Sequence, residues 1–190
     1  MRNFFALSLI VALCACSSSD PQVALPQSSG VSGPGGGDLT QTADLDGRYI
    51  DTIRIAPEGW KNITPGQQMT ITFEATGLAQ VKQFEIVIEP QPGHAFDLES
   101  ATFKPQAPFI TPFASGLQQD ADGSLHLGGA SLASIVTGDQ VLGTLTLTTA
   151  SGVGGLTAAS LRVTLISIGP TSQDRERYEG EALRFGVQVN

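Results

Sequence analysis

Beyond residue 16, short runs of the chain alternate between apolar and polar side chains. The clearest run covers residues 69–76, where Met, Ile, Phe and Ala alternate with Thr and Glu. A period of two predicts a strand with one buried face and one face in solvent, and we find no convincing run with the helical period. The pattern predicts strands over residues 49–56, 69–76, 84–89, 95–103, 124–127, 141–149, 161–168 and 182–189.

Turn-forming residues separate these runs. Thr64-Pro65-Gly66, residues 90–93 and Asp122-Gly123 combine the proline, glycine and aspartate that tight turns favour, and Gly128-Gly129 is interpreted in the same way. Many short strands separated by turns predict a sandwich or a barrel. We therefore predict an all-β domain over residues 47–190, a two-sheet jelly-roll β-sandwich of about eight or nine strands.

The N-terminus has the organisation of a secretory signal peptide over residues 1–15. Arg2 supplies the positive charge, and residues 4–13 are apolar but too short to cross a bilayer as a helix. Leu13-Cys14-Ala15-Cys16 resembles the bacterial lipobox, which implies cleavage before Cys16 and acylation of its thiol. The alternative is an ordinary signal peptide, cleaved near Ala15, that leaves a free thiol. The lipobox resemblance implies a lipid-anchored protein of the bacterial cell envelope. Ser17 follows the cysteine, and under the sorting rule of enteric bacteria the absence of Asp there favours the outer membrane, at its periplasmic face or at the cell surface.

Residues 16–46 are predicted to be the lipidated cysteine followed by a flexible tether. The stretch is rich in Ser, Gly and Pro and offers few large apolar groups for burial. As a flexible coil of about 25 residues, it would reach roughly 25 to 30 Å. Stable anchoring would need two or more acyl chains on Cys16, because one chain alone binds only marginally.

Charge and cysteine content narrow the choice of partner. The chain has 18 acidic and 10 basic residues and a net charge of -8. Such a surface repels phosphate groups, which argues against nucleic acid as a partner. Both cysteines, Cys14 and Cys16, lie at the leader, so a mature chain has no pair for a disulfide. Membrane contact is expected through the N-terminal lipid only.

Several segments together resemble the cohesin family and its relatives among cellulosomal and carbohydrate-binding modules. The segments are residues 63–71 (ITPGQQMTI), 81–90 (VKQFEIVIEP), 123–127 (GSLHL), 138 and 141–147 (VLGTLTL). The resemblance covers residues 47–190 and implies a jelly-roll sandwich. It also implies a protein partner bound through one face, which for cohesins is a dockerin module, or a glycan as in the carbohydrate-binding relatives. Glu89-Pro90 stands where the family usually has Tyr-Asp.

Aromatic residues in loops are candidate binding residues. Residues 103–113 contain three Phe and three Pro, which predicts a rigid loop. If Phe109 and Phe113 stand in solvent, they offer an apolar anchor to a partner; otherwise they fold back and close one end of the sandwich. Trp60 lies in a polar loop, where its indole would either stack on a sugar ring or cap the sandwich.

Two charged segments add further candidates. Residues 173–181 hold six charges of both signs, and Arg175, Arg177 and Tyr178 within it have side chains that interface hot spots favour. The alternative is a solvated loop. Asp120 and Asp122 begin a D-x-D-G sequence typical of calcium loops, but the further ligands are missing, and an Asp-Gly turn explains the same residues. Apart from this calcium candidate, we expect no cofactor.

The chain has few residues in a catalytic pattern. His94 and His126 have no cysteine partner and no H-E-x-x-H spacing, which argues against zinc. A G-x-S-x-G elbow is also missing. We therefore expect no enzyme but a lipid-anchored envelope module that binds a protein in adhesion or scaffolding. The alternatives are a carbohydrate-binding module that holds glycan at the cell surface and a structural envelope lipoprotein.

Overall fold

The computed structural model describes residues 22–24, 41–58, 64–112, 114–151 and 159–187. These residues form strands joined by turns and loops, so the predicted all-β class is confirmed. In chain order the strands are β1 (Gln22–Ala24), β2 (Gln41–Asp44), β3 (Thr52–Glu58), β4 (Gln68–Val81), β5 (Gln83–Pro90), β6 (Phe96–Pro105), β7 (Gly116–Gln119), β8 (Leu125–Ala130), β9 (Val136–Thr149), β10 (Ala159–Gly169) and β11 (Glu176–Val187).

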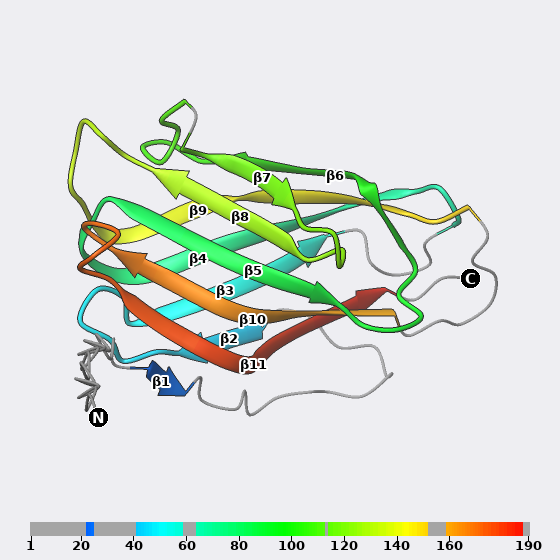
Figure 1. The fold of residues 1–190 in the computed structure, drawn as a ribbon, viewed down its shortest axis with the longest axis horizontal. Helices are drawn as coiled ribbons and strands as arrows, with labels where there is room; N and C mark the ends of the chain where they lie inside the picture. Colours follow the sequence, from blue (N-terminus) through cyan, green and yellow to red (C-terminus); the bar gives the residue numbers. More distant parts are fainter. Residues whose placement is uncertain (1–21, 25–40, 59–63, 113, 152–158, 188–190) are drawn as a thin grey trace, which may run out of the picture.

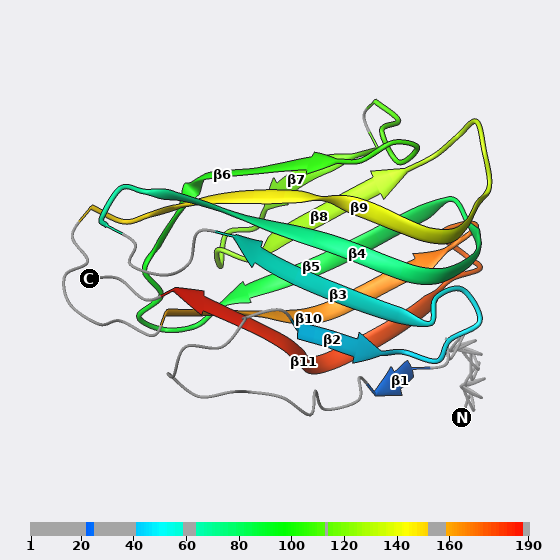
Figure 2. The ribbon, with the colours of Figure 1, turned by 180° about the vertical axis from the view of Figure 1, so that it is seen from behind.

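The strands form two sheets that face each other (Figure 1, Figure 2). One sheet has the strand order β1-β11-β10-β5-β8-β7 and the other β2-β3-β4-β9-β6; we call them the β5/β8 sheet and the β4/β9 sheet. In chain order, the strands change sheet after β1, β4, β5, β6, β8 and β9. These repeated crossings give the predicted jelly-roll sandwich.

The alternation read from the sequence corresponds to the buried and outer faces of the strands. Ile71 and Phe73 of β4 and Leu145 of β9 are fully buried, while the threonines between them are partly exposed. The antiparallel register places Ile71 opposite Leu145. The apolar faces of both sheets thus merge into one core, in which each large side chain contributes about 1.5–3 kcal/mol.

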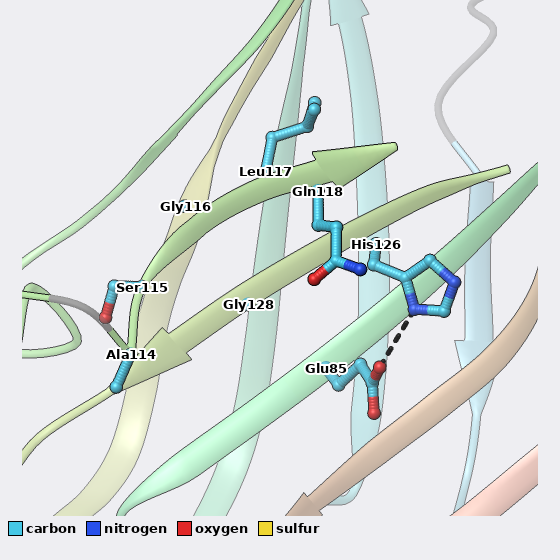
Figure 3. Close-up of a pocket in the computed structure, with 8 residues that line it drawn as sticks. All are labelled: Glu85, Ala114, Ser115, Gly116, Leu117, Gln118, His126 and Gly128. Carbon is cyan, nitrogen blue, oxygen red and sulfur yellow. Dashed lines mark hydrogen bonds and ion pairs between the residues drawn. The ribbon is translucent and has the colours of Figure 1, made fainter. Parts of the chain in front are cut away.

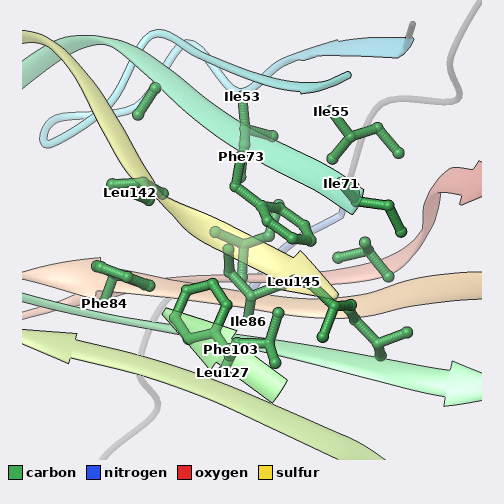
Figure 4. Close-up of a cluster of buried hydrophobic side chains, with 14 of the residues drawn as sticks. Ile53, Ile55, Ile71, Phe73, Phe84, Ile86, Phe103, Leu127, Leu142 and Leu145 are labelled. Atoms are coloured by element: carbon green, nitrogen blue, oxygen red, sulfur yellow. The ribbon is translucent and has the colours of Figure 1, made fainter. Parts of the chain in front are cut away.

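A chain of phenylalanine rings connects the two sheets inside this core (Figure 4). Phe73 of β4 packs edge-on against Phe103 of β6, with ring centroids 6.3 Å apart. Phe103 contacts Phe84 of β5 in the opposite sheet at 6.4 Å, and Phe84 contacts Phe109 of the β6–β7 loop at 5.1 Å. Such edge-to-face pairs add about 0.5–1.5 kcal/mol each beyond their buried area.

The expected number of strands is too low, because β1, β2 and β7 are also present. β2 lies within the predicted tether, yet Ala43 and Leu45 are buried and Ala43 pairs opposite Ile53 of β3. The folded body therefore includes residues from Gln41, and the predicted boundary at residue 47 is wrong. β2 gives a weak signal in the sequence because it is short and mostly polar.

β1 is the second strand within the predicted tether. Its backbone pairs in parallel with β11, with Gln22 opposite Arg177. Because β1 and β11 run in the same direction, Gln22 lies toward the end of the sandwich where β11 begins (Figure 1). The predicted flexible tether over residues 16–46 is therefore wrong at β1 and at β2, which belong to the sheets.

One carboxylate fastens the β2–β3 loop to β11. Glu176 accepts hydrogen bonds from the backbone nitrogens of Arg48 (3.1 Å) and Tyr49 (3.2 Å) and from the hydroxyl of Tyr178 (2.8 Å). The Tyr49 hydroxyl donates to Asp174 at 2.7 Å. Burial, together with this hydrogen bond, raises the pKa of Tyr49 to about 12. The two sheets are thereby joined along this edge.

Candidate functional site

The outer face of the β5/β8 sheet carries side chains of several kinds in two transverse rows. In strand order β10, β5, β8 and β7, the first row is Ser167, Glu85, Gly128 and Gly116, and the second is Leu165, Val87, His126 and Gln118. Because residues two apart on a strand share a face, both rows belong to the same surface. The first row therefore ends in two adjacent glycines beside the Glu85 carboxylate.

The missing side chains at these glycines leave a hollow of about 310 Å³, which we call the sheet hollow. Its lining is Glu85, Ala114, Ser115, Gly116, Leu117, Gln118, His126 and Gly128 (Figure 3). A Cβ atom at Gly128 would make only an ordinary van der Waals contact, with the carbonyl oxygen of Phe84 at 3.9 Å, so this position has room for a side chain. The backbone nitrogen of Ala130 donates to Ser115 Oγ at 2.9 Å, which fixes the rim of the hollow to β8.

A second hollow of about 180 Å³ adjoins the first on the same sheet. Glu85 and Ala114 line both hollows, so the two form one depression across the end of the face. Gln83, Ser172 and Arg175 also line the second hollow. The depression thus runs from β7 toward the β10–β11 connection.

Charged side chains converge at the sheet hollow. His126 Nδ1 lies 3.0 Å from Glu85 Oε1, and His126 Nε2 lies 3.1 Å from Asp120 Oδ2. The hydrogen bond to Glu85 and the charge of Asp120 raise the pKa of His126, against the opposing effect of burial. Arg175 Nη1 approaches Glu85 Oε2 at 4.0 Å. The imidazole therefore favours its protonated form between two carboxylates.

Two further ion pairs lie on the β5/β8 sheet. Arg162 of β10 contacts Glu89 of β5 at 2.9 Å, and Arg177 contacts Glu179 along β11 at 3.2 Å. All four side chains are partly exposed, so these pairs add little to stability. They give the surface charges of both signs that a partner can meet.

The outer face of the β4/β9 sheet has a different character. Its centre is a set of threonines in register, with Thr72 opposite Thr144 and Thr70 opposite Thr146. Threonine side chains are short and similar in length, so they make a level polar surface. Both hollows lie on the opposite sheet, and the two faces of the sandwich are therefore unlike in shape and charge.

The structure brings together only part of the binding residues expected from the sequence. Arg175 lines the second hollow, and Arg177 pairs in register with Ser167 in the first row. Phe109 and Tyr178 are both 0% exposed, so the expectation that they form a contact surface is wrong. Phe109 is held by the phenylalanine chain, and Tyr178 by Glu176.

Three further candidates lie outside the described residues. They are Cys16, Trp60 and Phe113.

Asp120 and Asp122 form an Asp-Gly turn between β7 and β8. The Gly123 nitrogen donates to the Asp120 carbonyl at 3.0 Å, and the Ser124 nitrogen donates to Asp122 Oδ1 at 2.9 Å. The latter bond lowers the pKa of the Asp122 carboxyl. Within the described ranges, no group of three or more His, Cys, Asp or Glu side chains is placed to hold a metal ion.

Glu85, Ser115, Gly116 and Gly128 were not predicted from the sequence as site residues. Gly128-Gly129 was predicted to be a turn, whereas both residues lie inside β8. A glycine within a strand often marks a position where another group approaches the backbone closely, and this was the available signal. The part of the chain that the structure describes contains no helix long and apolar enough to span a bilayer.

No family model matches the chain, and no curated protein matches it. The chain is similar to solved structures of cohesin modules. A type I cohesin–dockerin complex from Clostridium thermocellum matches with 12% identity over 73% of this chain and 99% of that chain, with a TM-score of 0.49. A type II cohesin from Bacteroides cellulosolvens matches with 8% identity over 72% and 98%, with a TM-score of 0.48.

A cohesin module of a family 33 glycoside hydrolase from Clostridium perfringens also matches. Its identity is 18% over 72% of this chain and 95% of that chain, with a TM-score of 0.45. The resemblance noted in the sequence thus recurs among solved structures. At these identities and TM-scores, the likeness assigns no partner to this chain.

Proposed function

We propose that this chain is a non-catalytic binding module, held at the bacterial cell envelope by lipid on Cys16, that docks a protein on the outer face of the β5/β8 sheet. The observation that carries the proposal is the sheet hollow of about 310 Å³ on the outer face of this sheet. A concave site with fixed polar groups can receive a projecting side chain of a partner.

The surroundings of the hollow have the composition of a protein interface. Leu165, which is half-buried, and Val87, which is only 8% exposed, form an apolar strip in the second row. Charged pairs stand around this strip: Glu85 with His126, Glu89 with Arg162, and Glu179 with Arg177. An apolar centre with a polar rim is typical of protein–protein contacts, and charges of both signs provide complementarity and orientation.

The ion pairs at the hollow disfavour acid–base catalysis. Ser115 and His126 line the same hollow, an arrangement that could resemble a nucleophile beside its base. However, the two ring nitrogens of His126 lie within 3.0 and 3.1 Å of the carboxylates of Glu85 and Asp120. A general base needs one ring nitrogen to accept the serine proton, and here both nitrogens are engaged. These charged and polar side chains at the hollow are therefore suited to contact a partner and not to transfer a proton.

A glycan ligand has less support than a protein partner. Sugar rings stack on exposed aromatic side chains, and the aromatic side chains whose burial the structure describes are all buried. These are Tyr49, Phe73, Phe84, Phe96, Phe103, Phe109 and Tyr178. Trp60 and Phe113 lie outside the described residues, so a glycan array with the purified protein remains the control for this alternative.

The test fills the hollow without disturbing the core. A Cβ at Gly128 would make only an ordinary contact at 3.9 Å, so Gly128→Tyr should fold normally and block the hollow with its ring. Thr146→Tyr places the same side chain on the outer face of the β4/β9 sheet. Immobilised wild type, Gly128→Tyr and Thr146→Tyr would each be incubated with an envelope extract of the bacterium that makes the protein, and retained proteins identified by mass spectrometry.

We expect a protein that wild type and Thr146→Tyr retain and that Gly128→Tyr loses by at least about tenfold, since about 1.4 kcal/mol of lost affinity suffices for that factor. Circular dichroism and thermal unfolding of the variants check that each is folded. Equal retention by Gly128→Tyr and wild type would refute docking at this face.

A further inference from the structure

Three large apolar side chains are exposed in the described part of the chain, and they gather at one end of the sandwich. Ile110 is 57% exposed, Leu132 79% and Ile135 58%. Ile110 belongs to the β6–β7 loop, and the other two belong to the β8–β9 loop. We call these three residues the apolar tip.

Hydrogen bonds hold the apolar tip in place. The backbone nitrogen of Thr111 donates to the carbonyl of Ala130 at 3.0 Å, and the nitrogen of Leu132 donates to Thr111 Oγ1 at 3.1 Å. The Ser131 hydroxyl donates to the Ser134 carbonyl at 2.9 Å and so closes the β8–β9 loop on itself. These hydrogen bonds connect the β6–β7 loop to the β8–β9 loop. The exposed apolar side chains of the two loops are therefore held in fixed positions.

The same end of the sandwich lies within reach of Cys16. Gln22 of β1 pairs with Arg177 near the start of β11, and the start of β1 and the β8–β9 loop lie at the same end (left in Figure 1, right in Figure 2). In the sheet order β1-β11-β10-β5-β8, four strand spacings separate β1 from β8, roughly 19 Å at about 4.8 Å each. The six residues from Cys16 to Gln22 span at most about 21 Å.

We infer that the apolar tip inserts into the lipid surface to which Cys16 anchors the chain. The inference rests on the proposed acylation of Cys16. An acyl chain in the bilayer and a chain segment of this length keep the β1 end of the sandwich close to the membrane. Burial of exposed apolar side chains then favours the orientation in which Ile110, Leu132 and Ile135 enter the interface.

Charges at this end indicate that the contact depends on apolar burial. Asp139 Oδ1 accepts a hydrogen bond from the Gly77 nitrogen at 3.1 Å, and Asp174 is bound by Arg48 and Tyr49. These carboxylates repel anionic headgroups, and salt screens that repulsion, so the insertion should not weaken as the salt concentration rises. In this orientation the strands stand upright on the membrane, and the β5/β8 face points sideways, where a partner can reach it.

The test uses the full chain purified from bacterial membranes and reconstituted into vesicles of phosphatidylethanolamine and phosphatidylglycerol. Leu132→Cys introduces a thiol at the apolar tip, and Ala121→Cys introduces one in the exposed turn between β7 and β8, at the opposite end. On the acylated chain Cys16 carries its thiol as a thioether, so a polarity-sensitive fluorophore labels only the introduced cysteine. Nitroxide-bearing lipids then report contact with the bilayer.

We expect the label at position 132 to be quenched several-fold more strongly than the label at position 121, at low and at high salt. Equal quenching at the two positions, on a chain whose intact mass shows acylation, would overturn the inference and leave the proposed anchoring standing. An intact mass that shows no acyl chain on Cys16 would overturn the proposed anchoring and the inference with it.

Discussion

At the scale of single residues, His126 links segments that are distant in the sequence. It pairs with Glu85, which lies 41 positions earlier, and with Asp120 in the turn that precedes its own strand. Arg175, from the β10–β11 connection, faces the same Glu85. The protonation state of one imidazole therefore bears on the contact between β5, β8 and two loops.

The raised pKa of His126 predicts a stability effect with a defined sign. The folded state holds the proton more tightly than the unfolded chain, whose histidine titrates near pH 6.5. The stabilisation by His126 is therefore fully present below about pH 6.5 and is lost as pH rises through the folded-state pKa. His126→Gln should lower the free energy of unfolding more at pH about 5.5 than at pH about 8.5.

Two measurements check this expectation. Urea unfolding of wild type and His126→Gln at both pH values gives the difference between their free energies of unfolding. NMR titration of the imidazole gives its pKa directly. Glu85→Gln, which removes the first cause of the shift, should bring the pKa of His126 down. An imidazole pKa at or below about 6.5 in the wild type would contradict the arrangement.

At the scale of elements, β8 combines a core face with an outer face that borders the sheet hollow, within six residues. Leu125 and Leu127 point into the core and His126 points outward. The two glycines continue this alternation: Gly128 faces the sheet hollow, and Gly129 faces the core. A Cβ at Gly129 would lie 2.3 Å from Phe84 Cε1 and 2.9 Å from Phe109 Cβ.

Adjacent Gly→Ala substitutions in β8 should therefore differ. In Gly129→Ala the added methyl group would collide with the Phe84 ring and with Cβ of Phe109, which should cost about 1–3 kcal/mol of stability. Gly128→Ala meets only an ordinary contact at 3.9 Å and should change the free energy of unfolding by less than about 0.5 kcal/mol. Urea denaturation followed by circular dichroism measures both, and equal effects of the two substitutions would count against this alternation.

The long strands could be predicted from the sequence, whereas short strands such as β2 could not. The difference has a physical cause. β4 and β9 alternate over many residues, with Phe73 and Leu145 on the buried side, so local pattern and final burial agree. β2 is short and polar and depends on its pairing with β3. Gly128-Gly129 could not be predicted correctly from local pattern either. The pair was predicted to be a turn, but it lies within β8, where Gly129 leaves room for the Phe84 ring and Gly128 lines the sheet hollow.

At the scale of the whole molecule, the sandwich presents two outer faces of different character. The period of two predicts that outward residues exist, but it does not say which strands become neighbours. Glu85, Gly116 and Gly128 form a site only after β5, β8 and β7 pair in register. Arg175 and Arg177 were found in the sequence because their charges stand together in one segment.

The proposed docking of a protein on the β5/β8 face is tested most directly by photo-cross-linking in the living cell. A photoreactive amino acid in place of exposed Gln118, which lines the sheet hollow, would be compared with one in place of Thr146 on the outer face of the β4/β9 sheet. We expect a discrete cross-linked protein from position 118 and none from position 146. Cross-linking to the same protein from position 146 alone, or equally from both positions, would contradict the proposed docking.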